Sequence, residues 1–211
     1  MQQLISLPGA LFILLFSLSA QALDRTRIAE SAQDVTPLLN GQSAPNINLQ
    51  MADGSPISLQ AFIFQQPTVV LFYRGGWCPY CSRQLAGLKD IEKELLALGY
   101  QVLAISPETP ERLQQQKLQS EFALELLSDH KLAAIKGFGV GYYVASDIVN
   151  QYTSQMNINL TSEASSGRAV LPAPAVFILD KKGKIKFNYV NPDYKERLSA
   201  ELLLQAAKLS L

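Results

Sequence analysis

The sequence has little of what metal and nucleic-acid sites require. Its 211 residues include two cysteines and one histidine, and 18 basic residues balance 18 acidic ones. Without a positive excess or a basic stripe, the chain offers no electrostatic surface for nucleic acid. A structural zinc site usually takes four Cys or His ligands, more than Cys78, Cys81 and His130 supply. The composition therefore predicts no nucleic-acid partner, no zinc site and no bound cofactor.

Long apolar runs are also scarce. The N-terminal one, residues 11–18, is followed by Ala-Gln-Ala at 20–22, which is typical of a signal peptide and its cleavage site. The run is shorter than the ~20 residues that span a bilayer, although residues 1–3 lack the usual basic residue and an uncleaved anchor stays as the alternative. We expect residues 1–22 to be removed on export to the periplasm or another extracytoplasmic compartment, leaving no stable membrane anchor.

The two cysteines lie in one short segment with an aromatic residue before them, namely Trp77, Cys78, Pro79, Tyr80 and Cys81. The apolar run 68–73 predicts a buried strand before this segment, and the periodicity of 82–98 predicts a helix after it. Unpaired N–H groups and the dipole at a helix N-terminus stabilise a thiolate. A purely structural disulfide would close too short a loop to restrict the unfolded chain much. The spacing therefore predicts a reversible dithiol/disulfide pair.

The remaining pattern alternates strands and helices. Further strands are predicted at 46–51, 57–59, 101–106, 124–127, 174–180 and 185–190, and further helices at 110–119, 131–137 and 198–211. Alternation of this kind favours crossover connections and a mainly parallel sheet, with the hairpin 46–59 at an edge.

Three regions follow from this pattern. Residues 23–42 form a polar, helix-leaning N-terminal extension that we expect to pack loosely, and residues 43–211 form one domain. Residues 139–172 interrupt the alternation and predict an insertion, a lid or binding loop with a helix within 144–156. Aromatic and apolar residues of the insertion are candidates for a substrate groove, with packing onto the core as the commoner use: Tyr142, Tyr143, Tyr152 and Met156.

Several short motifs carry a family resemblance, and they occur in the right order. They are Ala44-Pro45, Asp53-Gly54, and the segments 57–59, 70–81, 102–106, 127–129 and 176–180. From about residue 41 onward the chain resembles the peroxiredoxin-like proteins of the alkyl hydroperoxide reductase and thiol-specific antioxidant family. The resemblance implies an α/β thioredoxin fold of the redoxin type. A central mixed, mainly parallel sheet would be flanked by helices, with an N-terminal hairpin and an insertion before the last hairpin.

The site departs from the family pattern. In typical peroxiredoxins a Pro and then a Thr precede the peroxidatic cysteine; here Arg74 stands at the Pro position and Cys78 at the Thr position, so that Cys81 aligns with that cysteine. The family's distant arginine aligns with Pro174, and Arg74 or Arg168 could replace it.

Other features resemble thioredoxins. Pro174 resembles the cis-proline that faces their two cysteines and lets an extended substrate pair with the backbone; a trans proline opening a strand is the alternative. Trp77 resembles the aromatic residue that shields their site, and Pro79 would fix the local backbone.

We expect an exported thiol-disulfide oxidoreductase with an antioxidant role, acting on a peroxide or a disulfide and regenerated by a thiol reductant protein. In disulfide exchange, Cys78 is the exposed attacking thiolate and Cys81 resolves the mixed disulfide. In peroxide reduction, Cys81 is oxidised to sulfenic acid and Cys78 condenses with it. The alternatives are a protein-disulfide reductase with little peroxidase activity and a non-enzymatic copper-binding module that also uses His130.

Overall fold

The computed structural model describes residues 27–119 and 124–211, so the expected signal peptide lies outside the described residues. Seven strands form one sheet in the order β2-β1-β5-β4-β3-β8-β9. Their bounds are β1 (Asn48–Met51), β2 (Pro56–Ser58), β3 (Thr68–Phe72), β4 (Gln101–Ser106), β5 (Glu125–Ser128), β8 (Ala175–Leu179) and β9 (Ile185–Val190). The helices are α1 (Leu59–Ile63), α2 (Pro79–Ala97), α3 (Pro110–Gln119), α4 (Ala133–Gly137), α5 (Ser146–Met156) and α6 (Ala200–Leu209).

The sheet is mixed, as expected, but it is not mainly parallel. Parallel pairing is confined to β3 with β4 and β4 with β5, the strands joined by the crossover helices α2 and α3. The other four strands come from two hairpins, β1 with β2 and β8 with β9, which join the central strands β5 and β3 in antiparallel fashion. The predicted edge hairpin is confirmed, because β2 ends the sheet.

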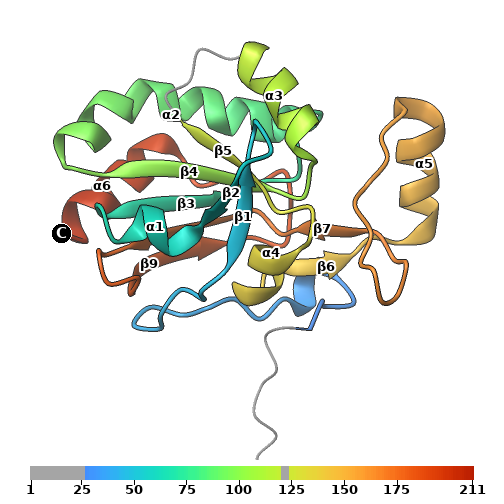
Figure 1. Cartoon of the computed structure of the whole chain (residues 1–211), viewed down its shortest axis with the longest axis horizontal. Coiled ribbons are helices and arrows are strands. Elements are labelled where there is room, and N and C mark those ends of the chain that lie inside the picture. Colours follow the sequence, from blue (N-terminus) through green and yellow to red (C-terminus); the bar gives the residue numbers. More distant parts are fainter. Residues whose placement is uncertain (1–26, 120–123) are drawn as a thin grey trace, which may run out of the picture.

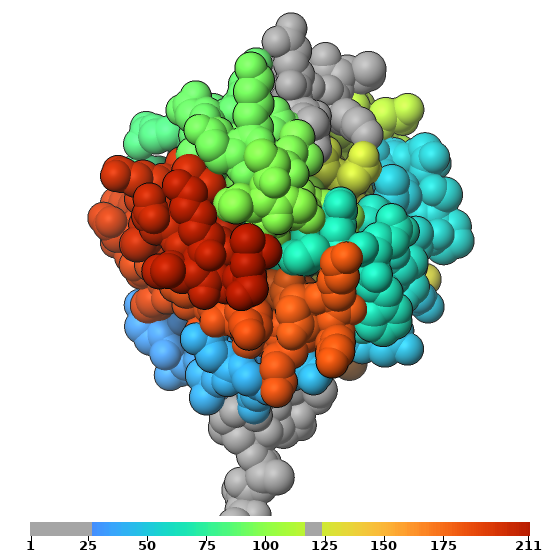
Figure 2. Space-filling view, turned by 90° about the vertical axis from the view of Figure 1, so that its left-hand side faces the viewer, coloured from blue at the N-terminus to red at the C-terminus, as the bar shows by residue number. Residues whose placement is uncertain are grey.

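Helices cover both faces of this sheet (Figure 1). Strand β3 is buried along its whole length, and its side chains alternate between the two faces. Val69 and Leu71 join the core under α2 and α6, whereas Val70 and Phe72 join the core under α1 and α4. Figure 2 shows the C-terminal residues in red beside the green surface of α2, consistent with the packing of α6 on α2. The cysteines belong to the α2 side.

The described part of the N-terminal extension, residues 27–42, does not pack loosely, and its helical content is the short 3-10 helix η1 (Ala32–Asp34). Its backbone runs along the insertion, where the Ala29 N–H donates to the Gly141 carbonyl and the Tyr143 N–H donates to the Ala29 carbonyl, both at 2.9 Å. The extension is therefore held by backbone pairing, which side-chain periodicity does not reveal.

The insertion is confirmed as a separate structural unit. Strands β6 (Gly141–Tyr143) and β7 (Val170–Pro172) form an antiparallel ribbon, and the expected helix α5 lies between them in sequence. Figure 1 shows α5, in orange, projecting from the sheet domain. Within the described ranges, no helix has the length and apolar character needed to cross a membrane.

Candidate active site

The cysteine pair lies where β3 leads into α2, as the sequence predicts. Cys78 is the residue that caps the N-terminus of α2, Pro79 is the first helical residue and Cys81 lies in the first turn. The connecting turn needs glycine at Gly75, where φ is +149° and a Cβ atom would lie 2.4 Å from the Trp77 indole nitrogen. This turn sets both sulfurs at the positive end of the helix dipole.

Both cysteines are free thiols and both are only 1% exposed. The expectation of an exposed Cys78 thiolate is therefore wrong for this structure. The cause is the segment 191–199, between β9 and α6, which lies against the start of α2. Its Tyr194 ring contacts the Tyr80 ring edge-on, with centroids 5.6 Å apart, and Leu198 packs in the same core as both sulfurs.

The same segment brings an arginine to the sulfurs. Arg197 Nη2 lies 3.3 Å from Cys81 Sγ and 4.0 Å from Cys78 Sγ, and Nη1 donates to Gln84 Oε1. Arg197 could not be predicted from the sequence, because the family resemblance points to the position before β8 for the arginine of the site. The one available signal was a basic residue just before the closing helix, which packs on the cysteine-bearing helix.

The environment separates the two thiols. The pKa of Cys78 is lowered to about 6, chiefly by a hydrogen bond from the Cys81 side chain. The Cys81 N–H and the charges of Arg74 and Arg197 lower it further, and together these effects outweigh burial, which raises it. Burial, and then the hydrogen bond to Cys78, raise the pKa of Cys81. Arg197 lies nearer to Cys81 than to Cys78. Cys78, however, occupies the N-cap position of α2 and accepts hydrogen bonds from the Cys81 side chain and N–H. The first negative charge of the pair therefore belongs mainly on Cys78.

Arg74 is held in an aromatic cage beside the pair. Its guanidinium carbon lies 5.1, 5.5 and 4.2 Å from the ring centroids of Trp77, Tyr152 and Tyr194. Its Nη2 also donates to the Tyr152 hydroxyl. The cage joins the cysteine turn, helix α5 of the insertion and the segment 191–199. The charge of Arg74 is one of the causes that lower the pKa of Cys78.

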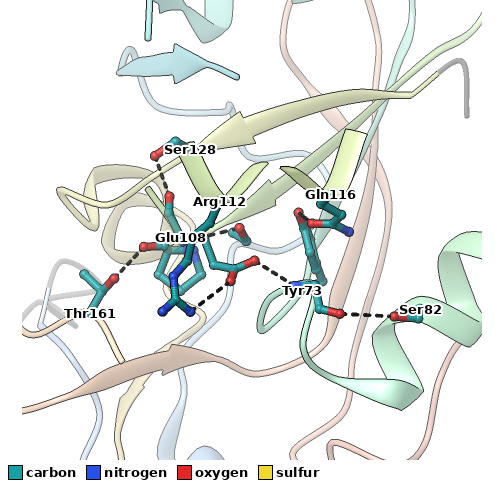
Figure 3. Close-up of polar contacts among 10 residues, drawn as sticks. Tyr73, Ser82, Glu108, Arg112, Gln116, Ser128 and Thr161 are labelled. Atoms are coloured by element: carbon teal, nitrogen blue, oxygen red, sulfur yellow. Dashed lines mark hydrogen bonds and ion pairs between the residues drawn. The ribbon is translucent and has the colours of Figure 1, made fainter. Parts of the chain in front are cut away.

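The partly buried carboxylate of Glu108 holds the turn from the other side (Figure 3). The Gly76 N–H donates to Glu108 Oε2 at 2.7 Å, and Arg112 Nη1 lies 3.8 Å from Glu108 Oε1. The Ser128 hydroxyl donates to the Glu108 carbonyl at 2.6 Å. Burial raises the pKa of Glu108. The carboxylate fixes the backbone that leads to Trp77 and the cysteines.

Two expectations about the site are wrong. No peptide bond of the described residues is cis, so the cis-proline expected at Pro174 is wrong, and the trans alternative holds. Pro174 precedes β8, which pairs with β3 in regular register. Arg168 does not replace the family arginine, because its guanidinium binds the Glu30 carboxylate at 2.9 and 3.1 Å and lies over the Tyr143 ring.

His130 makes its side-chain contact with Ser128 and not with a cysteine: its Nδ1 lies 3.4 Å from Ser128 Oγ. Across residues 27–119 and 124–211, no group of three or more His, Cys, Asp or Glu side chains is placed to hold a metal ion.

A thioredoxin fold that carries a pair of thiols at a helix N-terminus, beside two arginines, defines a thiol-dependent oxidoreductase. Comparison with known proteins is consistent with that class. The AhpC/TSA family model matches residues 40–188. The chain belongs to this family.

Individual relatives are peroxiredoxins. The chain is 35% identical to peroxiredoxin Bcp of Escherichia coli over 106 residues, which are 50% of this chain and 67% of the relative. It is 26% identical to the chloroplastic peroxiredoxin Q of Oryza sativa subsp. japonica over 163 residues, 77% of this chain and 64% of the relative. These relatives identify the enzyme class as a peroxiredoxin-like peroxidase and support thiol-dependent peroxide reduction.

Solved structures share the fold. Peroxidoxin BcpB of Mycobacterium tuberculosis has a TM-score of 0.63 at 17% identity, covering 81% of this chain and 96% of its own. Reduced Prx3 of Vibrio vulnificus, solved in complex with hydrogen peroxide, has a TM-score of 0.65 at 19% identity with the same coverage of the two chains. At these identities the comparison establishes the fold alone.

Proposed function

We propose that Cys78 and Cys81 are the redox centre of a thiol-dependent peroxidase, with Cys78 as the attacking thiolate. The observation that carries this assignment is the lowered pKa of Cys78, about 6, next to a Cys81 thiol that stays protonated. A thiolate is the nucleophilic form of cysteine, so Cys78 is ready to react near neutral pH. This assignment differs from the family alignment, which favours Cys81.

The two cysteines can carry out the oxidative half of the reaction by themselves. The Cys78 sulfur attacks one peroxide oxygen, so that an S–O bond forms, the O–O bond breaks, and the other oxygen leaves as an alcohol or water after taking up a proton. Cys81 then attacks the sulfenic sulfur, which expels water and gives the Cys78–Cys81 disulfide. An external dithiol donates two electrons through a mixed disulfide and restores both thiols.

Two observations favour a peroxide over a protein disulfide as the acceptor. With both cysteine residues only 1% exposed, a small peroxide needs a smaller opening of the segment 191–199 than a folded protein does. Pro174 is trans, so it offers no exposed backbone of the thioredoxin type beside the sulfurs. A protein-disulfide reductase is therefore the weaker candidate.

The experiment compares wild type, Cys78→Ser and Cys81→Ser with hydrogen peroxide and cumene hydroperoxide, using a dithiol reductant and a sulfenic-acid probe. We expect turnover in wild type, none in Cys78→Ser, and one labelled sulfenic acid on Cys78 in Cys81→Ser. Labelling of Cys81 in Cys78→Ser would refute the assignment of the attacking thiol. Absence of wild-type turnover would refute the peroxidase, if in Cys81→Ser the Cys78 thiolate also rapidly attacks a protein disulfide and is trapped as a mixed disulfide with release of the other thiol.

We further propose that the enzyme works outside the cytoplasm. The apolar run 11–18 and the Ala-Gln-Ala sequence at 20–22 support a cleaved signal peptide. In such a compartment a dedicated thiol partner, and not the cytosolic thiol pool, would set the redox state of the pair. Fractionation and intact-mass measurement test this: we expect an exported chain beginning at residue 23. A full-length cytoplasmic chain would refute it.

A further inference from the structure

A cavity of about 610 Å³ lies on the insertion side of the aromatic cage. Its walls come from the N-terminal extension, the strand β6, the helix α5 and the segment 191–199. Tyr142, Tyr152 and Tyr194 line it, and so does the Arg74 side chain. The four groove candidates of the sequence, Tyr142, Tyr143, Tyr152 and Met156, thus line the same cavity as Arg74.

Arg74 is a buried cation whose hydrogen-bonding capacity is only partly used. Its side chain is buried, with the residue only 4% exposed, and its Nε has no hydrogen-bond partner. Its guanidinium contacts are the Tyr152 hydroxyl and three ring faces. Among the described residues, no carboxylate forms an ion pair with it. The Cys78 thiolate acts on Arg74 through its charge, but the Arg74 Nε still has no hydrogen-bond partner. A guanidinium fits a carboxylate especially well because it offers parallel N–H donors, and a buried donor without a partner is costly.

The outer wall has a different chemistry. Ile148 and Met156, on α5, line the cavity and are 38% and 49% exposed. The second arginine of the cavity, Arg168, is already neutralised by Glu30. The cavity therefore offers, at its inner end, a guanidinium without a carboxylate partner among the described residues, and an apolar surface towards solvent. A ligand that satisfies both has one anionic group on an apolar or aromatic body.

We propose that this cavity binds a small organic carboxylate, whose carboxylate pairs with Arg74 and whose apolar body rests on α5. The proposal goes beyond peroxide reduction and does not depend on it. Three parts of the cavity lie outside the matched family region 40–188, namely residues 30–33, Pro192 and Tyr194. The cavity is therefore built in part from segments that this family model does not include.

The chain contains its own reporter of binding. Trp77 is the single tryptophan, and its ring lies 5.1 Å from the Arg74 guanidinium and 5.1 Å from the Tyr152 ring. Phenylbutyrate is the probe, and phenylbutyramide is its neutral counterpart of nearly equal shape. Titration of the reduced protein should change Trp77 fluorescence saturably, and calorimetry should give the same dissociation constant. We expect the carboxylate to bind at least about tenfold more tightly, as a charge-assisted hydrogen bond provides.

Met156 provides matched variants that leave the buried residues untouched. Met156→Glu places a negative charge on the cavity wall and should weaken phenylbutyrate binding at least about threefold, by repulsion near the surface. Met156→Gln has nearly the same size without the charge, so it should weaken binding clearly less than Met156→Glu does. Leu96→Glu puts the same charge on an exposed site of α2, where the residue is 56% exposed, and should also leave binding unchanged.

Three results would overturn the proposal: equal affinity for phenylbutyrate and phenylbutyramide, no saturable signal from phenylbutyrate, or equal weakening by Met156→Glu and Met156→Gln. Because the readout is binding to the reduced protein, loss of peroxide turnover does not affect it. The peroxidase proposal can therefore fail while this one stands, and the reverse.

Discussion

Arg197 offers the sharpest test of how the protein activates its thiols. Arg197→Gln keeps a polar side chain of similar reach but removes the positive charge that lies 3.3 Å from Cys81 Sγ and 4.0 Å from Cys78 Sγ. A hydrogen bond to a charged group contributes about 1.5–3 kcal/mol, and one pKa unit corresponds to ~1.4 kcal/mol. Arg197 is only partly buried, so we expect its contribution to lie at the lower end of this energy range, about 1.5 kcal/mol. The pKa of Cys78, about 6 in wild type, should rise by about one unit.

The assay is the pH dependence of alkylation by iodoacetamide, because only the thiolate reacts. Well below the midpoint the thiolate fraction falls about tenfold for a one-unit rise in pKa, and well above it the fraction hardly changes. Arg197→Gln also uncovers the sulfurs and so speeds alkylation at every pH. The position of the midpoint separates this access effect from the electrostatic one.

Two further variants complete the test. Arg197→Lys retains a charge but loses the planar fork, so its midpoint should lie between those of wild type and Arg197→Gln. Lys195→Gln removes an exposed charge from the same segment, and its midpoint should match wild type. An unchanged midpoint in Arg197→Gln, or an equal shift in Lys195→Gln, would refute the role assigned to Arg197.

Three other predictions concern stability. Gly75→Ala should lower the free energy of unfolding by about 1–3 kcal/mol in urea titrations, because φ is +149° and the new Cβ would meet Trp77. Glu108→Ala should cost a similar ~1–3 kcal/mol by leaving the Gly76 N–H without an acceptor, and Glu108→Gln should cost less because it keeps one. Burial raises the pKa of Asp129 to about 7, so the folded state binds this proton more tightly and its contribution is largest below about pH 4. As pH rises towards 7 stability should fall by at most ~1.4 kcal/mol per unit from this group, and Asp129→Asn should remove that slope in urea titrations across pH.

The parts of the fold that the sequence predicts correctly are those specified by local pattern. The uninterrupted apolar run of β3 and the helical repeat of α2 place the cysteines at the strand-to-helix junction, and the structure confirms this position. The Asp53-Gly54 turn predicts the first hairpin, where the Ser55 N–H donates to Asp53 Oδ1 at 2.9 Å. In each case the determining contacts lie within a few residues in sequence.

The features of the fold and of the site that the sequence does not predict depend on contacts between distant parts of the chain. Strand direction is set by how the hairpins dock onto β5 and β3, which hydrophobic periodicity does not encode. The Arg197 guanidinium reaches Cys81 across 116 residues, and Arg74 reaches Tyr152 across 78. The burial of Cys78 likewise results from the segment 191–199, which carries no motif. Local sequence therefore locates the reactive atoms but not the residues that cover and charge them.

The position of the pair on α2 also explains why one site can hold both roles of the redox cycle. Cys78 and Cys81 are three residues apart, and residues at this spacing on a helix have Cβ atoms about 5–6 Å apart. A disulfide needs Cβ atoms about 3.5–4.5 Å apart, so closure requires a small adjustment of the first turn and no unwinding of α2. Before closure, the buried pair shares a single negative charge, which the helix N-terminus, Arg74 and Arg197 stabilise together. Disulfide formation removes that charge and leaves Arg74 and Arg197 without the thiolate. The dithiol form is therefore favoured, and the disulfide is easier for a thiol partner to reduce.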